Sequence, residues 1–340
     1  MKLKEKKVYQ REKTHFFESG LLIQSKGRKL FFHSKKSDTE IKMPFRFIDI
    51  FIFSRLLRRL LRLDQCNIIP SKEGDNNFIV IRGSIVYLLD KEKEQFKVLF
   101  KLKQCRNLLF NSHCYLEDGK LLIGEYGFSN NQTVPFYLIN LNNFSYKELD
   151  LFGDVNARHV HCIRRDPYTN NIWICTGDFH GECHLFVFSS NLELIEIIGD
   201  GGQLFRTCDL IFLKNEVVWL MDSPIEEPYV ISYDRKSRKI NKLQRLEGPV
   251  WHICKLRDYY IAAVSVEPGK SVRTEYAQLL VSNDGKDWTL IEKYKKDIFP
   301  WIFKFAVLEI CKKEENDFYI NFQSTSNNDG KSVLYNLVAS

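Results

Sequence analysis

Two histidines and an aspartate lie close together in the segment "RHVHCIRRDPYTNNIWICTGD", residues 158–178. His159 and His161 occupy positions i and i+2 of an apolar run typical of a β-strand, so both imidazoles are expected on one face. Asp178 ends the next apolar run. Such a set can hold a divalent metal through the two histidines, or act as a general acid and base. A hydrogen-bonded pair of structural histidines is the alternative.

The segment "GEYG" places Glu125 and Tyr126 between two glycines at the end of another apolar run. The glycines leave room for a ligand near the backbone. A carboxylate beside a phenol can position a sugar or act as a base. Alternatively, Glu125 accepts hydrogen bonds from backbone groups of the next repeat unit and Tyr126 lies in the rim of the fold. We group both with His159, His161 and Asp178 as candidate catalytic residues.

Other side chains at strand ends are candidates for binding a substrate. The guanidinium of Arg206 suits the carboxylate of an acidic sugar, because it can donate two parallel hydrogen bonds. It can instead neutralise Asp178 and Asp222. Trp251 can stack on a sugar ring or pack in the core. The candidate substrate-binding residues are Arg206, Asp222, Trp251, Glu267, Arg158 and Gln203.

Polar residues recur at the ends of comparable strands along the chain. They are Arg82, Glu125, Asp178, Asp222, Glu267 and Gln323, at steps of 43, 53, 44, 45 and 56 residues. Short β-branched and aromatic runs separated by turn residues fill the intervals. A period of roughly 40 to 50 residues with four strands per unit is typical of a β-propeller. The sequence therefore predicts an all-β fold in which these residues converge at the mouth of a central channel.

The period predicts a six-bladed β-propeller over residues 64–340. Its blades are expected at residues 64–104, 105–150, 155–199, 203–246, 248–293 and 297–340. Residues 1–63 then form a separate N-terminal region. Two strands of that region, "GLLIQS" and "KLFFHS", are expected to pair with the last blade, because closure removes exposed sheet edges.

Residues 53–63, "FSRLLRRLLRL", break the strand pattern. Their leucines and arginines alternate with helical periodicity, which predicts a short amphipathic helix inserted before the propeller. A helix of this kind packs on the base of the fold, contacts a partner protein, or lies on an anionic membrane surface.

Composition narrows the class of protein. The net charge of +7 is modest for 340 residues and the basic residues are spread, so nucleic acid is not an expected partner. The sequence shows neither a secretory signal nor an apolar run of about 18 residues that would span a membrane. The nine cysteines include no CxxC pair and are expected to be reduced and mostly buried. These features predict a cytoplasmic location.

With its blades placed, the chain resembles the sialidase-like, BNR-repeat (Asp-box) six-bladed propellers, especially uncharacterised members associated with bacterial capsule and exopolysaccharide gene clusters. The segments that carry the resemblance include "GEYG", "GQLFRT", "MDSPIEEPYV", "GPVW", "SVEPG" and "SNDGKDW". The last is similar to an Asp-box, in which Asp284 would cap the backbone of its own turn and Trp288 would pack against the blade. The resemblance implies a link to surface polysaccharide metabolism.

Acids, bases, a cation and an aromatic ring at one mouth suit a carbohydrate better than a nucleotide, for which there is no Gly-rich phosphate loop. The leading hypothesis is a propeller that binds or processes a charged glycan or glycan precursor. As an enzyme, it would be a glycoside hydrolase or a uronate lyase. The alternative is a non-catalytic scaffold that binds a protein of polysaccharide assembly. A divalent metal at His159 and His161 is the candidate cofactor, and the sequence does not identify another.

Overall fold

The computed structural model describes residues 1–18, 20–35, 37–72, 76–127, 133–312 and 314–338. Its strands form seven four-stranded sheets with antiparallel neighbours. A sheet of this kind is the blade of a β-propeller. The chain divides into two units, Cys66–Arg245 and Met1–Gln65 with Leu246–Ser340.

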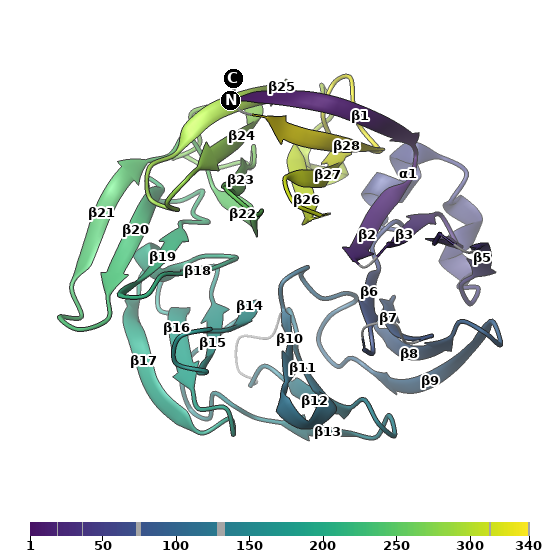
Figure 1. Cartoon of the computed structure of the whole chain (residues 1–340), viewed down its shortest axis with the longest axis horizontal. Coiled ribbons are helices and arrows are strands. Elements are labelled where there is room, and N and C mark those ends of the chain that lie inside the picture. Colours follow the sequence, from purple (N-terminus) through teal and green to yellow (C-terminus); the bar gives the residue numbers. More distant parts are fainter. Residues whose placement is uncertain (19, 36, 73–75, 128–132, 313, 339–340) are drawn as a thin grey trace. The chain divides into compact units, whose positions relative to one another are not determined.

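The unit Cys66–Arg245 contains four sheets, each a meander of consecutive strands (Figure 1). The first two sheets comprise β6 (Asn67–Pro70), β7 (Asn77–Arg82), β8 (Ile85–Asp90) and β9 (Gln95–Lys101), then β10 (His113–Leu116), β11 (Lys120–Gly124), β12 (Phe136–Asn140) and β13 (Tyr146–Leu149). The next two comprise β14 (Val160–Arg165), β15 (Ile172–Thr176), β16 (Cys183–Phe188) and β17 (Leu194–Gly201), then β18 (Ile211–Phe212), β19 (Glu216–Leu220), β20 (Tyr229–Asp234) and β21 (Ile240–Arg245).

The other unit contains three sheets, one of which joins strands from both ends of the chain. Two are meanders of β2 (Lys13–Glu18), β3 (Leu21–Lys26), β4 (Lys29–His33) and β5 (Asp38–Lys42), and of β22 (Val250–Lys255), β23 (Tyr260–Val264), β24 (Tyr276–Ser282) and β25 (Thr289–Lys295). The third comprises β26 (Val307–Lys312), β27 (Asp317–Gln323), β28 (Lys331–Val338) and β1 (Lys2–Gln10).

The helical segments are short connections between strands. They are η1 (Phe47–Phe51), α1 (Arg55–Leu60), η2 (Glu117–Gly119), η3 (Gln203–Phe205) and η4 (Trp301–Phe303). Across the part of the chain that the structure describes, none of these helices has the length and apolar character needed to cross a membrane.

The prediction of six blades is wrong, because the N-terminal region contributes a seventh. The segments "GLLIQS" and "KLFFHS" form β3 and β4 of a separate sheet, whose buried side chains include Ile23, Leu30 and Phe32. The strand that completes the last sheet is instead β1, which pairs with β28. Since β1 is an edge strand with a charged and mostly exposed sequence, "KLKEKKVYQ", hydrophobic periodicity does not reveal it.

The prediction of an amphipathic helix at residues 53–63 is also wrong. The region contains only α1, six residues long, in which Arg58 and Arg59 are buried while Leu56 is exposed. A carboxylate explains this orientation, because Nη1 of Arg59 lies 2.6 Å from Oδ2 of Asp297. Two of the arginines are therefore turned into the protein rather than toward a membrane surface.

Inner strands of the unit Cys66–Arg245 are buried on both faces. Along β15, Ile172 and Ile174 pack in a cluster with Leu122 of the preceding sheet. Trp173, which points to the opposite face, packs in a second cluster with Trp219 of the following sheet. Packing on both sides fixes the ends of these strands, and with them the polar residues that follow.

We expect His15, in β2, to make the fold sensitive to acid. Burial and the nearby Lys13 lower its pKa to about 3, with Glu309 opposing, and its Nε2 lies 2.6 Å from Oγ of Ser25. An unfolded histidine has a pKa of about 6.5, so the unfolded chain takes up the proton first as the pH falls through that value. Stability contributed by neutral His15 is therefore present above pH ~6.5 and lost below it.

Between pH 7.5 and pH 5, this residue should lower the free energy of unfolding by about 2 kcal/mol. Urea unfolding at both pH values measures the loss. The His15→Gln variant, whose amide can still bond to Ser25, should lose about 2 kcal/mol less than the wild type. Equal losses in the two proteins would contradict the expectation.

Candidate functional site

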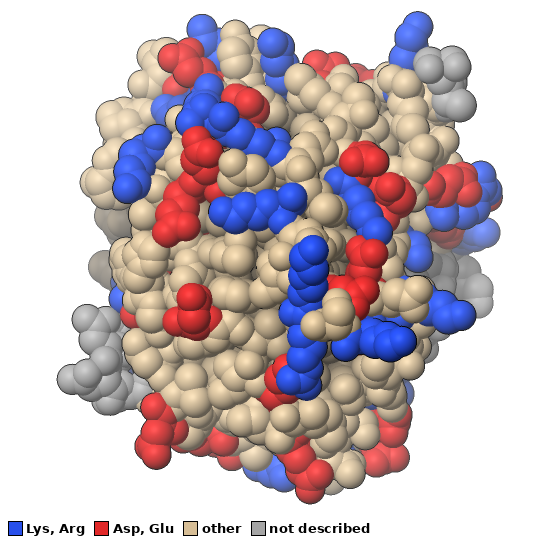
Figure 2. All heavy atoms as spheres, turned by 90° about the vertical axis from the view of Figure 1, so that its left-hand side faces the viewer, with Lys and Arg blue, Asp and Glu red and all other residues tan. Residues whose placement is uncertain are grey.

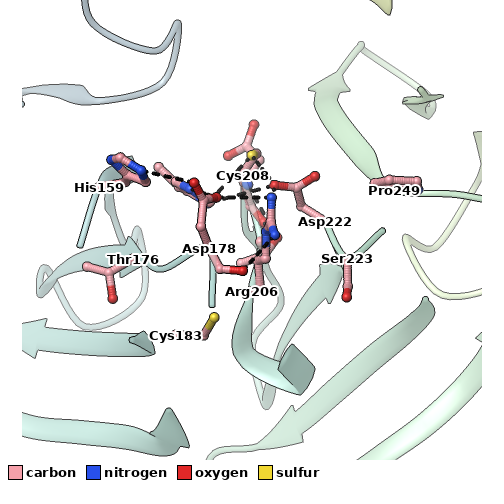
Figure 3. Close-up of polar contacts among 12 residues, drawn as sticks. His159, Thr176, Asp178, Cys183, Arg206, Cys208, Asp222, Ser223 and Pro249 are labelled. Atoms are coloured by element: carbon pink, nitrogen blue, oxygen red, sulfur yellow. Dashed lines mark hydrogen bonds and ion pairs between the residues drawn. The ribbon is translucent and has the colours of Figure 1, made fainter. Parts of the chain in front are cut away.

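Polar side chains from three successive sheets of the unit Cys66–Arg245 meet at one place (Figure 3). Most of them lie next to the buried strands β11, β14, β15 and β19, so packing on either side fixes their positions. The members, hereafter the polar cluster, are Tyr126, His159, His161, Asp178, Arg206, Cys208 and Asp222.

Asp178 is the centre of the polar cluster. Its carboxylate lies 2.9 Å from Nε2 of His159, 3.4 Å from Nε2 of His161 and 3.0 Å from Nη2 of Arg206. The hydroxyl of Tyr126 donates to the same carboxylate at 3.1 Å, and Nη1 of Arg206 donates to the backbone carbonyl of Asp178 at 2.8 Å. Burial acts to raise the pKa of Asp178, but the two histidines and Arg206 outweigh it and hold that pKa well below its ordinary value.

The aromatic rings of the cluster are stacked. The ring of Tyr126 lies parallel to that of His159, with centroids 3.6 Å apart and planes 4° apart, and its centroid is 6.1 Å from that of His161. Burial lowers the pKa of His159 although Asp178 opposes this, and burial together with Asp178 raises the pKa of Tyr126. Both rings are therefore neutral at pH 7 and donate to an anionic Asp178.

The backbone around the two histidines is distorted. His159 has φ of 57°, in the left-handed region that a residue with a β-carbon adopts at a cost of about 1–3 kcal/mol. The pairing of β14 with β15 shifts between Val160 and Cys162, so regular alternation is broken at His161. The histidines thus reach Asp178 through a bulge and a strained residue, and not through the simple i, i+2 geometry expected from the sequence.

Asp222 is the second carboxylate of the cluster and differs sharply from Asp178. Its Oδ2 accepts from the thiol of Cys208 at 3.3 Å and lies 3.4 Å from Nε of Arg206. Burial raises the pKa of Asp222, Arg206 and His161 oppose the rise, and Asp178 adds to it. Two carboxyl groups with opposite pKa shifts resemble an acid and base pair. The side chains of Asp178 and Asp222 are, however, only 16% and 2% exposed, which leaves little access for a substrate.

Three atoms of metal-ligating type also meet here. Nδ1 of His161, Sγ of Cys208 and a carboxylate oxygen of Asp222 all lie within 4.8 Å of one another. Nitrogen, sulfur and oxygen ligands suit zinc. Positive charge is already supplied by Arg206, and burial together with Asp222 raises the pKa of the Cys208 thiol, whereas a metal binds the thiolate. His159, proposed from the sequence as a ligand beside His161, is not one of the three.

Glu125 does not belong to the polar cluster. It is fully buried, and its carboxylate accepts hydrogen bonds from the backbone amides of Lys103, Gln104 and Cys105 at 2.7, 2.7 and 2.9 Å. The hydroxyl of Tyr137 donates to it at 2.8 Å. These four donors occupy the carboxylate, so Glu125 fixes the segment after β9 against β12. The bonded amides precede its own sheet and do not belong to the next one.

Gln203 and Arg158, two other residues expected at the site, lie next to members of the cluster. Nε2 of Gln203 donates to the backbone carbonyl of Asp178 at 3.0 Å, and its Oε1 accepts from Ser223 at 2.7 Å. The guanidinium of Arg158 lies over the ring of Phe179, 5.3 Å from its centroid. Gln203 therefore braces the loop that carries Asp178, whereas the head group of Arg158 contacts an aromatic ring.

Trp251 and Glu267, the remaining expected substrate-binding residues, belong to the other unit. The ring of Trp251 packs edge-on against Phe305, with centroids 5.2 Å apart. Glu267 accepts a hydrogen bond from Ser265 at 2.9 Å. Each of these two side chains therefore contacts a residue of its own unit.

Cys208 is the member of the cluster that the sequence analysis did not select. It stands two residues after Arg206 in "FRTCD", the same spacing as that between His159 and His161. In an extended segment this spacing puts two side chains on one face. The same two-residue spacing in successive sheets is the sequence signal that could have identified Cys208.

The turn at residues 282–288 has the hydrogen bonds that the Asp-box resemblance implies. Oδ1 of Asp284 accepts from the backbone amides of Lys286 and Asp287 at 2.8 and 3.0 Å. The indole of Trp288 is buried and donates to the carbonyl of Gly285 at 3.1 Å. The turn connects β24 and β25 and serves the fold, and one such turn does not define a family.

No protein-family model matches the chain, and no curated protein matches it. Solved structures with a similar fold include the N-terminal domain of Nup159 (12% identity, 99% of this chain and 96% of that chain covered, TM-score 0.53). Sqt1 of Saccharomyces cerevisiae is also similar (9%, 100% and 100%, 0.55), as is a chain of the S. cerevisiae complex of Dbp5 with Nup159 and Gle1 (12%, 99% and 95%, 0.52). The sialidase-like resemblance finds no support among them. At these identities the likeness shows the fold alone, which is an all-β propeller of seven blades.

Proposed function

We propose that this protein is a non-catalytic propeller that binds another protein. The polar cluster supports a structural role, because His159 and His161 are each 1% exposed and Asp178 is shared by four side chains. Buried networks of hydrogen bonds and ion pairs stiffen a fold. Nup159, to which the chain is similar, is bound to Dbp5 in a solved complex, which supports a protein partner by analogy.

One observation carries the proposal: four large apolar side chains are strongly exposed around α1. They are Phe47 (81%), Phe53 (80%), Ile298 (94%) and Trp301 (64%). The first two lie just before α1, and α1 packs against η4, which contains Trp301. We call these four residues the apolar surface. We infer that they form one surface, and contiguous exposed apolar groups mark interaction sites.

Exposed apolar residues on another face lie among charges. Leu194 and Leu243, on β17 and β21, are 48% and 41% exposed. On the side of the molecule that carries these strands, Figure 2 shows Lys and Arg interspersed with Asp and Glu. Single exposed apolar residues of this kind are normal, so the apolar surface is the better docking site.

A protein segment with apolar side chains is the partner that this surface fits. Its apolar groups would cover Phe47 and Trp301. A membrane is less suitable, because Arg58 and Arg59 are buried and unavailable to lipid head groups. The sequence-based expectation of a polysaccharide-assembly protein supplies the first candidate. All nine cysteines are free thiols, which supports a cytoplasmic location.

The proposal is tested by cross-linking followed by reconstitution. A photo-reactive amino acid at position 47 traps the partner in the native cells, and the purified partner is then titrated by calorimetry. We expect Trp301→Ser to weaken binding by about 30-fold, since buried aromatic anchors typically contribute about 2 kcal/mol at interfaces. Tyr168→Ser, at a residue that is 54% exposed in the other unit, is the matched control and should bind as the wild type does.

Three outcomes would overturn this proposal. Binding of the partner that is unaffected by Trp301→Ser and Phe47→Ser would remove the apolar surface from the interaction. Flotation with anionic vesicles that these variants abolish would indicate a membrane instead. Cleavage of a charged glycan that His161→Ala abolishes without unfolding the protein would restore the enzyme hypothesis.

A further inference from the structure

A small cavity lies beside α1 in the unit that joins the two ends of the chain. Its volume is about 60 Å³, and it is lined by residues of β3, α1, β27 and β28. Eight of its lining residues are Lys or Arg, and two are acidic. This cavity is independent of the polar cluster and of the partner proposed above.

Carboxylates neutralise only part of this positive charge. Arg55 pairs with Asp64 at 2.6 Å and with Asp329 at 2.8 Å, and Arg59 pairs with Asp297 at 2.6 Å. In contrast, no carboxylate among the described residues lies within 4.0 Å of the charged groups of three other lining residues. These are Arg62, Lys304 and Lys331.

Two side chains show that donor groups remain available at the cavity. Arg58 is 7% exposed, and within the described part of the chain its buried Nε has no hydrogen-bond partner. The ammonium of Lys304 donates to Oε1 of Gln323, a neutral acceptor, at 2.5 Å. Nη1 of Arg58 pairs with Asp64 at 3.3 Å, so only its Nε is a spare donor. Buried or partly buried cations that lack an anion are costly, so an anion in the cavity would stabilise Lys304 and could accept from Nε of Arg58.

The electrostatic environment agrees with this geometry. Burial lowers the pKa of Lys304 to about 8, and the charges of Lys13, Arg62 and Arg55 add to the effect, while Glu309 opposes it. Burial also lowers the pKa of Arg62, with a contribution from Arg59. Each cation is therefore disfavoured by its neighbours in the absence of a counter-charge.

The size of the cavity restricts the anion. A buried water needs roughly 10–15 Å³ of such space, so a volume of about 60 Å³ accommodates a group of about five heavy atoms. A tetrahedral phosphoryl group has that size, carries −1.5 to −2 charges at pH 7 and accepts hydrogen bonds in several directions. We propose that the cavity binds a phosphoryl group, either of orthophosphate or of a small phosphate monoester.

Calorimetric titration of the full-length protein tests the site, with orthophosphate, glycerol 3-phosphate and chloride as probes at constant ionic strength. Arg62→Gln and Lys304→Gln each remove a cation that has no carboxylate partner, so both variants should fold. We expect each to weaken phosphate binding about tenfold, the effect of losing one charge-assisted hydrogen bond. Lys270→Gln, at an exposed lysine that does not line the cavity, is the matched control and should bind as the wild type does.

The two sources of the phosphoryl group give different results. Tighter binding of glycerol 3-phosphate than of orthophosphate would identify a monoester site, and the reverse order would identify a site for free phosphate. Equal heats for phosphate and chloride, or equal affinities of all three variants for phosphate, would overturn the proposal. Circular dichroism melting of each variant confirms that any loss of binding occurs in folded protein. None of these results depends on the apolar surface or its partner.

Discussion

Replacing Asp178 by Ala should lower the free energy of unfolding by about 3–5 kcal/mol, the range observed when one member of a buried ion pair is removed. The variant leaves the guanidinium of Arg206 buried beside Asp222, whose own pKa burial raises, and it removes the shared acceptor of Tyr126, His159 and His161. Guanidinium unfolding of the purified variant measures the change.

Asp154→Asn, at an exposed aspartate of the same unit, is the matched control and should change stability by less than ~0.5 kcal/mol. The double variant Asp178→Ala with Arg206→Met should recover part of the loss, because the orphaned cation is removed as well. If Asp178→Ala were as stable as the control, the cluster would not support the fold, and the result would favour a functional role for its residues.

Arg59→Met should cost about 3 kcal/mol of unfolding free energy, although methionine preserves much of the apolar stem. The guanidinium of Arg59 pairs with Asp297 and Asp329, donates to the carbonyl of Phe303 at 2.8 Å and lies over the ring of Phe299. Its loss leaves Asp297 and the carbonyl of Phe303 without this donor, while Asp329 keeps its ion pair with Arg55. Thermal and chemical unfolding of the variant measure the effect.

Arg62→Gln, three residues further along and beyond the end of α1, is the control for this second prediction. Within the described part of the chain its guanidinium donates to the carbonyl of Arg59 at 2.9 Å and pairs with no carboxylate, so the substitution should cost less than about 1 kcal/mol. A similar loss in both variants would mean that the arginines act through their apolar stems. A stable Arg59→Met would show that its ion pairs contribute nothing to the fold.

The repeat of polar strand ends located most of the polar cluster from the sequence, because the register of a strand determines which residue follows it. The steps between Asp178 and Asp222 reflect equivalent positions in successive sheets, and the structure brings those two residues together with His161 and Arg206. Glu125 satisfies the same spacing but turns to three backbone amides instead. Spacing along the chain does not encode which way a strand-end side chain turns.

Two of the wrong predictions from the sequence have the same cause, because both concern charged residues. The strand β1 was overlooked because its lysines lie at a sheet edge, where apolar alternation is not required. In α1, Arg58 and Arg59 were expected to face outward, yet carboxylates distant in sequence, such as Asp297, hold them inside. A prediction from local periodicity assumes that charged side chains stay in water. A long-range ion pair can hold such a side chain inside the protein, and the prediction then fails.

The pairing of β1 with β28 sets a limit on how the protein is made. The 320 residues between Gln10 and Lys331 must be synthesised before the two strands can meet. At roughly 5–20 residues per second, β1 waits on the order of 16–64 seconds as an unpaired segment. The four lysines and one glutamate of "KLKEKKVYQ" would discourage it from pairing with other nascent chains during that delay. The charge that makes β1 difficult to recognise from its hydrophobic pattern would thus also limit its pairing with other nascent chains until β28 is synthesised.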